Sequence, residues 1–323
     1  MKASGLLVII LVTCILNCHL VEANGWKQKE FTIAAWCPPP NTAENMRSMA
    51  NDNYNLINVE FWNDPMGPFV DPTEQLNIAG QNGMKAMLYS LLITPSTLDN
   101  PVQRAKLDQL IDKAKNNPAM EAYFVADEPQ ASAFPTLLRL VSYIKERDPN
   151  HLAFINLFPS YANQQQLAVD LKEAPKGPVG IPDNYLGAGT NADTVKFYAE
   201  YLRQYINVVK PEFISYDHYH FMANNDGEQY FLNLALIRNA AVRADLPFFN
   251  VIQSCRWESG WRLPTGGEMR WLAFTTLAYG GRGICWFVYW GTKQNGAIIQ
   301  DGVRSSNADQ VAAINKDIRA IGT

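Results

Sequence analysis

The sequence predicts an α/β fold, a closed (β/α)8 barrel of the TIM type that forms a single domain. Eight short apolar runs rich in Val, Ile and aromatic residues recur along the 323 residues, and amphipathic stretches typical of helices lie between them. The hydrophobic content of 47% is that of a folded globular protein with a sizeable core. Eight repeated βα units fit a closed barrel, whose typical length of ~250 residues this chain exceeds.

The N-terminal segment has the features of a secretory signal peptide. Lys2 precedes an apolar run over 6–16, and Val21-Glu22-Ala23 matches the small-x-small pattern of a cleavage site. We therefore expect residues 1–23 to be a signal peptide, residues 24–323 to be the catalytic domain, and the protein to be secreted. The apolar run is shorter than the ~20 residues that cross a bilayer, so an uncleaved membrane anchor is the less favoured alternative.

Strands and helices then alternate in order. The predicted strands cover 31–36, 56–62, 85–91, 122–126, 152–158, 213–219, 248–254 and 284–290. Predicted helices include 101–116, 132–147, 193–209, 228–243 and 307–321, and Gly322 follows the last in a C-cap-like position. The Pro- and Gly-rich stretch 174–189 predicts a long loop beside the active face. An open doubly wound sheet is the alternative, but no Gly-x-Gly-x-x-Gly follows an early strand and no Walker motif occurs.

Charge and cysteine content limit the partners and the redox chemistry. With 27 Lys+Arg against 31 Asp+Glu the formal charge is -4, and no long basic run occurs, so nucleic acid is not an expected partner. Cys37, Cys255 and Cys285 follow the signal segment, which is too few for a disulfide-built scaffold. A bridge between Cys37 and Cys255 and a set of three buried thiols both remain open.

The most informative motif follows the fourth predicted strand. Active sites of such barrels lie at the carboxyl ends of the strands, and Asp127-Glu128-Pro129 stands there after Tyr123 and Phe124. A carboxyl group with aromatic neighbours has its pKa raised by desolvation, so it can stay protonated and act as a general acid. The alternative is that Asp127 or Glu128 only caps the next helix.

Asp217, at the end of the sixth predicted strand, is the candidate second carboxylate. Side chains at alternate strand ends can face each other at the ~5 to 9.5 Å that glycoside hydrolysis uses. A structural carboxylate paired with Arg or His is the alternative. Glu258 is expected to be a loop residue. Polar and aromatic residues at other strand ends are predicted to line a sugar site, and these are Asn58, Glu60, Asn156, Tyr216, Tyr219, Gln253, Trp257 and Trp290.

Tryptophans in or just after the first, second, seventh and eighth strands support a carbohydrate site. Aromatic rings stack on the C–H faces of sugars, while amide, hydroxyl and carboxyl groups bond to sugar hydroxyls. These tryptophans are Trp36, Trp62, Trp257, Trp261, Trp286 and Trp290. About half of them could instead fill the barrel or pack under helices, as we expect of Trp286.

A metal or cofactor is not expected. His218 and His220 share a face of the sixth strand, but His151 is the one other histidine after the signal segment, and no convincing third and fourth ligands occur. A metal-dependent hydrolase built on Asp217, His218 and His220 is therefore a lesser alternative.

The strand 4 motif resembles the Asn-Glu-Pro of clan A (β/α)8 glycoside hydrolases, whose Glu is the acid/base, with Asp127 in place of Asn. The stretch 277–290 is similar to the helix 7 to strand 8 passage of family 42-like β-galactosidases. That clan has its nucleophilic Glu at the end of strand 7, where this sequence has Gln253 and Ser254.

Two further resemblances imply other layouts. The adjacent Asp and Glu are similar to those of N-acetylhexosaminidase families 20 and 123, in which the Asp orients the substrate acetamide and the Glu is the acid. Carboxylates on strands 4 and 6 resemble the α-galactosidase clan and would use Asp127 or Glu128 with Asp217.

The resemblances imply hydrolysis of O-glycosidic bonds in an oligo- or polysaccharide without a cofactor. Glu128 would be the general acid/base, Asp127 would orient substrate or water, and Asp217 would be the second carboxylate. A carbohydrate-binding barrel without turnover is the alternative from another class.

Overall fold

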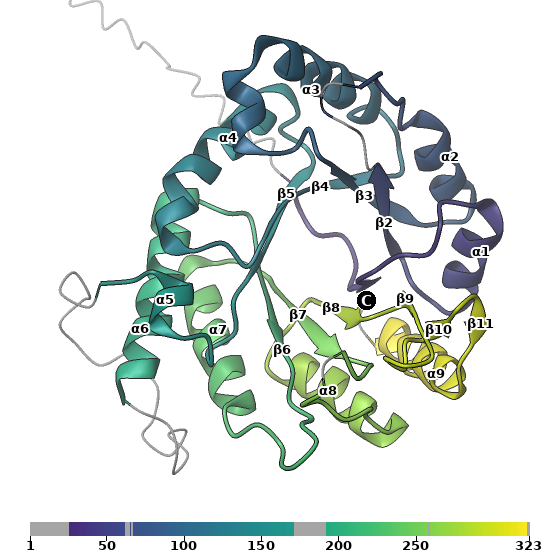
Figure 1. Cartoon of the computed structure of the whole chain (residues 1–323), viewed down its shortest axis with the longest axis vertical. Helices are drawn as coiled ribbons and strands as arrows, with labels where there is room; N and C mark the ends of the chain where they lie inside the picture. The colour runs from purple at the N-terminus through teal and green to yellow at the C-terminus, as the bar shows by residue number, and fades with distance from the viewer. Residues whose placement is uncertain (1–25, 62–64, 66, 171–191, 258, 322–323) are drawn as a thin grey trace, which may run out of the picture.

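The computed structural model describes residues 26–61, 65, 67–170, 192–257 and 259–321, and these form a ring of eight parallel strands surrounded by helices (Figure 1). The sheet order is β1-β8-β7-β6-β5-β4-β3-β2. The predicted (β/α)8 fold is confirmed. The strands are β1 Thr32–Ala35, β2 Leu56–Phe61, β3 Lys85–Ser90, β4 Met120–Asp127, β5 Leu152–Leu157, β6 Ile214–His218, β7 Phe248–Gln253 and β8 Gly283–Phe287.

Asn55 closes the ring between β1 and β2. Its side-chain oxygen accepts from the N–H of Ile33 at 2.7 Å, and its amide N–H donates to the carbonyl of Phe31 at 2.9 Å. The N–H of Asn55 also donates to the carbonyl of Ile33 at 3.1 Å. These bonds satisfy backbone groups at the one junction of the ring that lacks a regular ladder.

The helices lie outside the ring and agree with the predicted ones to within a few residues. They are α1 Ala43–Asn51, α2 Thr73–Gln81, α3 Pro101–Ala114, α4 Phe134–Arg147, α5 Gln164–Leu167, α6 Ala192–Gln204, α7 Tyr230–Ala244, α8 Gly266–Ala278 and α9 Ser306–Ile321. Local caps set some of their starts. Asn100 accepts from two N–H groups at the start of α3, with Pro101 in the first turn, and Thr265 forms a capping box with Glu268 at the start of α8.

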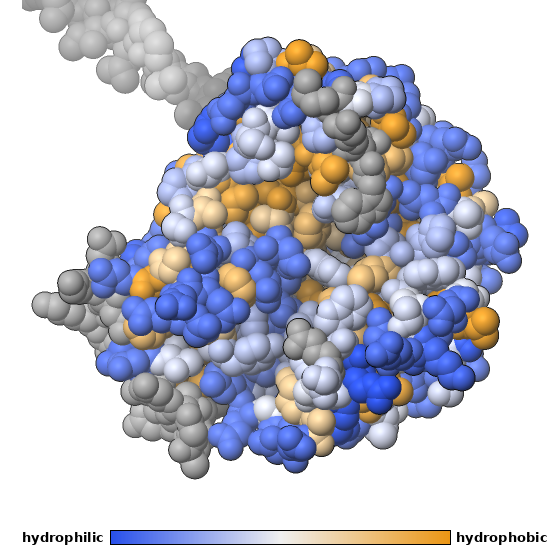
Figure 2. All heavy atoms as spheres, viewed as in Figure 1, coloured by the Kyte–Doolittle hydropathy of each residue, from blue (hydrophilic) through white to orange (hydrophobic). Residues whose placement is uncertain are grey.

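Strand alternation divides the core into two layers. One set of side chains fills the ring, including Leu56, Phe154 and Phe249, and the other packs between the strands and the helices. Trp286 belongs to the outer layer, where its indole N–H donates to Asn315 on α9 at 2.8 Å. The expectation that Trp286 is a packing residue is confirmed. Figure 2 shows hydrophilic residues over the outer helices and apolar residues toward the middle of the face.

The eighth predicted strand ends earlier than expected. After Phe287 the regular ladder ends, and the N–H groups of Tyr289 and Trp290 donate to the carbonyls of Trp36 and Cys37, both at 2.9 Å, in the segment that follows β1. A small sheet follows, made of β9 Trp290–Gly291, β10 Ile299–Gln300 and β11 Val303–Arg304. Trp290 therefore lies on this sheet.

Other expectations have mixed outcomes. Cys37, Cys255 and Cys285 are free thiols, and two of them are buried. In the part of the chain that the structure describes, no helix has the length and hydropathy needed to span a membrane. The predicted signal peptide, the loop 174–189, Trp62, Glu258 and Gly322 lie outside the described residues.

Candidate active site

A cavity of about 720 Å³ opens at the carboxyl ends of the strands. Its walls come from the ends of β4, β5, β6, β7 and β8 and from the loops that follow β1, β5, β6 and β7. The volume lies in the range of small-molecule sites. This is the position that the barrel fold predicts for an active site.

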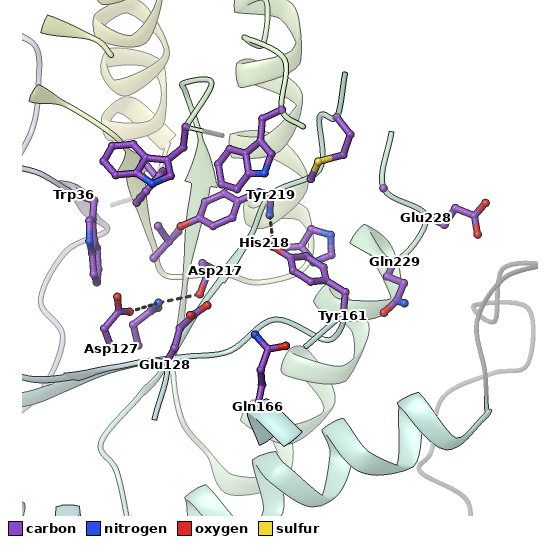
Figure 3. A pocket seen from close by; sticks show the side chains of 17 residues that line it. Trp36, Asp127, Glu128, Tyr161, Gln166, Asp217, His218, Tyr219, Glu228 and Gln229 are labelled. Carbon is purple, nitrogen blue, oxygen red and sulfur yellow. Dashed lines mark hydrogen bonds between the residues drawn. The ribbon is translucent and has the colours of Figure 1, made fainter. Parts of the chain in front are cut away.

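Three carboxyl groups and one amide form the floor of the cavity (Figure 3). Asn156, on β5, donates through its amide nitrogen to Asp127 at 3.1 Å and to Asp217 at 3.0 Å. The hydroxyl of Ser215 donates to the amide oxygen of Asn156 at 2.9 Å. Because that oxygen is occupied, the amide N–H groups of Asn156 face the two aspartates.

The backbone at the end of β4 turns Glu128 into the cavity. The pairing of β4 with β5 shifts register between Phe124 and Ala126, which turns Asp127 toward the interior, and regular alternation would then send Glu128 to the opposite face. Glu128 itself has a left-handed backbone with a φ of 44°, and its N–H donates to the carbonyl of Asn156 at 2.8 Å. Such a conformation in a residue other than glycine is strained and is concentrated at functional sites.

Neither carboxylate serves as a helix cap. The short 3-10 helix Ala131–Ala133 and helix α4 begin after Gln130 and Ala133, and neither start has a side-chain cap. The helix-cap alternative for Asp127 and Glu128 is therefore excluded.

The environment favours protonated carboxyl groups. Burial, with a smaller contribution from the charge of Asp127, raises the pKa of Glu128 to about 7, and a hydrogen bond with Asp217 opposes this rise. Burial and the charges of Glu128 and Asp127 raise the pKa of Asp217 well above its ordinary value. Burial also raises the pKa of Asp127, although the bond from Asn156 opposes it. All three shifts therefore act in the same direction, toward the protonated form of these carboxyl groups.

Asp217 and Asp127 differ in access to the cavity. Asp217 is 2% exposed and lies close enough to Glu128 for each to affect the pKa of the other, whereas Asp127 lies within the cavity walls but opens onto the cavity. Among the described residues Asp217 has no Arg or His partner, so the structural ion-pair alternative does not apply.

Aromatic rings form another wall of the cavity. The ring centroid of Tyr219 lies 4.4 Å from that of Trp261 and 5.0 Å from that of Phe287. Trp257 packs edge-on against Phe287, with the two ring centroids 5.1 Å apart. Trp36 also lines the cavity and stands on the Asp127 side in Figure 3. Of the predicted binding residues, Asn156, Tyr219 and Trp257 thus line the same cavity as the three carboxylates.

Tyr216 and Gln253 do not line this cavity. Since Ser215 and Asp217 point into the ring, alternation sends Tyr216 outward, where it is fully buried in the outer layer. The buried amide of Gln253 donates to the carbonyl of Phe221 at 3.0 Å and accepts from its N–H at 2.8 Å. Gln253 therefore connects the chain after β7 to the chain after β6.

The predicted residues on β2 lie elsewhere in the ring. Asn58 and Glu60 alternate with outer-layer residues of β2, so they face the interior, but neither lines the cavity. Burial and then the charge of Glu60 raise the pKa of Cys37 to about 11, which places Glu60 near Cys37. Trp290, on β9, is also outside the cavity lining.

Several loop residues line the cavity without having been predicted. Tyr161 and Gln166 follow β5, and Met222, Glu228 and Gln229 follow β6. No motif marks these positions, because they come together at the cavity only when the segments after β5 and β6 fold over the barrel mouth.

The two histidines point toward α7. His218 lines the cavity, but its Nδ1 lies 2.9 Å from the amide oxygen of Asn233, while His220 packs between Tyr230 and Trp271. Burial lowers the pKa of His218 to about 4. Within the described ranges, no three His, Cys, Asp or Glu residues are grouped as metal ligands.

Comparisons with known proteins identify the fold. No protein-family model and no curated protein matches the sequence. The hyperthermostable endo-1,4-β-D-mannanase of Thermotoga petrophila RKU-1 superposes with a TM-score of 0.60 and 13% identity, covering 91% of this chain and 100% of the mannanase. Another structure, an endo-β-1,4-mannanase of Thermotoga petrophila, gives 0.56 and 12% over 90% and 77%. A triple mutant of an endo-β-1,4-glucanase from Xanthomonas axonopodis pv. citri gives 0.52 and 12% over 86% and 90%. These neighbours share the barrel.

Proposed function

We propose that the protein hydrolyses O-glycosidic bonds of a carbohydrate, with Glu128 as the general acid/base. The observation that carries the proposal is a strained, partly buried carboxyl group in the cavity, whose pKa of about 7 keeps a proton available near neutral pH. A general acid works best when its pKa lies near the operating pH. The glycosidase names of the structural neighbours agree with this assignment.

The three carboxyl groups then have different tasks. Glu128 donates its proton to the leaving oxygen, and Asp127, exposed to the cavity, orients either the attacking water or the substrate's own acetamide. Asp217, buried on the floor of the same cavity, is the second carboxyl group and helps to set the protonation of Glu128, because the two groups affect each other's pKa. Gln253, which replaces the strand 7 Glu of clan A, is held by backbone groups, so the proposal does not use a nucleophile from β7.

The charge of the cavity favours an uncharged or cationic sugar. Among the residues that the structure describes, four carboxyl side chains and no Lys or Arg line the cavity, and His218 is neutral above its pKa of about 4. These carboxyls belong to Asp127, Glu128, Asp217 and Glu228. An anionic sugar such as a uronate would enter without a cation to pair with, which disfavours its binding. The aromatic wall supplies a stacking surface for the sugar ring.

Secretion is part of the proposal and rests on the N-terminal sequence alone. Expression of the full chain in a secretory host, followed by N-terminal sequencing of the protein in the medium, tests it. Retention of the first 23 residues in the mature protein would contradict the expected cleavage.

The decisive experiment compares wild type with Glu128→Gln on a panel of aryl glycosides and natural polysaccharides. We expect Glu128→Gln to lose turnover by about 10²- to 10⁴-fold while glycan affinity stays nearly unchanged. Glu146→Gln, at a side chain that is 74% exposed, is the matched control and should retain full activity. Near-normal hydrolysis by Glu128→Gln would end the assignment.

A carbohydrate-binding protein without turnover is the second candidate, because β7 ends in Gln253 rather than Glu. Calorimetric binding of a glycan, without release of reducing ends from any substrate, would favour this candidate.

A further inference from the structure

A second hollow adjoins the carboxyl cavity and shares one wall with it. The hollow has a volume of about 420 Å³ and is lined by Arg256, Trp257, Ser259, Thr292, Gln294 and Asn295. Trp257 also lines the carboxyl cavity. Trp257 therefore lines two neighbouring spaces, each within the size range of small-molecule sites.

Trp257 is unusually open for a residue of its type. Its side chain is 45% exposed, and the ring is supported edge-on by Phe287, with centroids 5.1 Å apart. A large aromatic ring held by a neighbour but left open to solvent is a stacking surface for a ligand.

Hydrogen bonds between two loops fix the shape of the hollow. The N–H of Arg256 donates to the carbonyl of Asn295 at 2.7 Å, and the Arg256 guanidinium donates to the carbonyl of Gln294 at 2.9 Å. The N–H of Asn295 donates to the hydroxyl oxygen of Thr292 at 3.3 Å, and the N–H of Thr292 donates to the amide oxygen of Asn295 at 3.0 Å. A ligand would find the walls already in place, so little ordering would oppose binding.

The polar groups of the hollow suit neutral hydroxyl groups. Ser259 and Gln294 make no side-chain hydrogen bond within the part of the chain that the structure describes, and Arg256 has no carboxylate partner there. The residues that line this hollow within the described part of the chain carry one cationic group, Arg256, and neutral polar groups, whereas carboxyl groups line the adjoining cavity. Amide, hydroxyl and guanidinium groups beside an indole ring are the chemistry that recognises a sugar.

We propose that this hollow binds a second sugar unit of a substrate whose first unit occupies the carboxyl cavity, with Trp257 contacting both. The substrate is then an oligosaccharide or polysaccharide, not a single sugar on a small leaving group. This inference rests on the proposed function, because it assumes that the carboxyl cavity takes a sugar.

Chain-length dependence of binding tests the second site. The probes are manno-, cello-, xylo- and chito-oligosaccharides of one to six units, titrated calorimetrically into the Glu128→Gln variant, which does not consume them. For the series that binds, we expect affinity to rise about tenfold from one unit to two. Gln294→Ala and Ser259→Trp, which change the hollow only, should reduce that gain and leave the one-unit affinity unchanged.

Two further variants separate this site from general damage. Trp257→Ala should weaken both the one-unit and the two-unit ligand, because the ring borders both spaces. Lys293→Ala, on the same turn but outside the lining, should change neither.

The outcomes distinguish the two proposals. Affinity that does not depend on chain length, or a two-unit gain that survives both Gln294→Ala and Ser259→Trp, overturns the second site while hydrolysis still supports the first proposal. Length-dependent binding without hydrolysis by wild type keeps the second site and refutes the enzyme. Absence of binding by every series overturns both.

Discussion

Replacing the proposed acid with its neutral counterpart should stabilise the protein in a pH-dependent way. Glu128 lies partly buried beside two other carboxyl groups, so its ionised form is unfavourable in the folded state. Glu128→Gln removes that charge while leaving an amide that can still donate to Asp217. The variant should therefore be more stable than wild type at pH 8 and show much less of this difference at pH 5.

The magnitude follows from the raised pKa. The pKa of Glu128 rises from 4.5 to about 7 in the folded protein. Because the folded-state pKa is raised, the protonated Glu128 side chain contributes to wild-type stability. That contribution is complete below pH 4.5 and is lost as the pH rises through about 7. A rise of about 2.5 corresponds to about 3.4 kcal/mol at 1.36 kcal/mol per pKa unit. Since solvent reaches part of this side chain, we expect about 1–2 kcal/mol of that to be measurable.

Urea denaturation followed by tryptophan fluorescence at pH 5 and pH 8 measures the effect. Equal m-values for wild type and variant are required before the free energies are compared. The exposed Glu146→Gln variant is the control and should show no pH-dependent gain. A Glu128→Gln variant whose stability relative to wild type is the same at both pH values would refute the burial argument.

The remaining predictions concern the groups around Glu128. Asp127→Asn removes a negative charge that helps to raise the pKa of Glu128, so the alkaline limb of the kcat/KM profile should move to lower pH by up to about one unit; an unmoved limb would contradict this. Ser215→Ala leaves the amide oxygen of Asn156 buried without its donor and should cost about 1–3 kcal/mol in urea denaturation. Ser254→Ala is its matched control, because the buried Ser254 hydroxyl has no partner among the described residues, and it should cost clearly less.

The strands and most helices could be predicted because their signals are local. Apolar runs such as 213–219 and periodic stretches such as 101–116 carry their pattern in adjacent residues, and caps such as Asn100 confirm the boundaries. The predicted end of the eighth strand, at residue 290, was wrong, because β8 ends at Phe287 through contacts between distant segments. The backbone of Tyr289 and Trp290 bonds to the distant loop after β1, a contact that no local pattern encodes.

The candidate site was predictable in outline but not in detail. The carboxyl ends of parallel strands meet at one end of a barrel, so the convergence of Asp127, Glu128 and Asp217 follows from the fold. Alternation within β6 could have excluded Tyr216, because Asp217 and Tyr216 cannot both face the ring. The role of Gln253 could not be foreseen, since its partners lie on a loop folded back from another strand.

The sequence by itself determined the eight βα units, the strand end that carries adjacent carboxylates, and the aromatic content available for a binding wall. The tertiary structure alone decided that the left-handed backbone of Glu128 turns its side chain into the cavity, that Asn156 joins Asp127 to Asp217, and that Trp257 lines two spaces. Secondary structure depends on near neighbours in the chain, whereas a pKa and a cavity depend on side chains that packing brings together from distant segments.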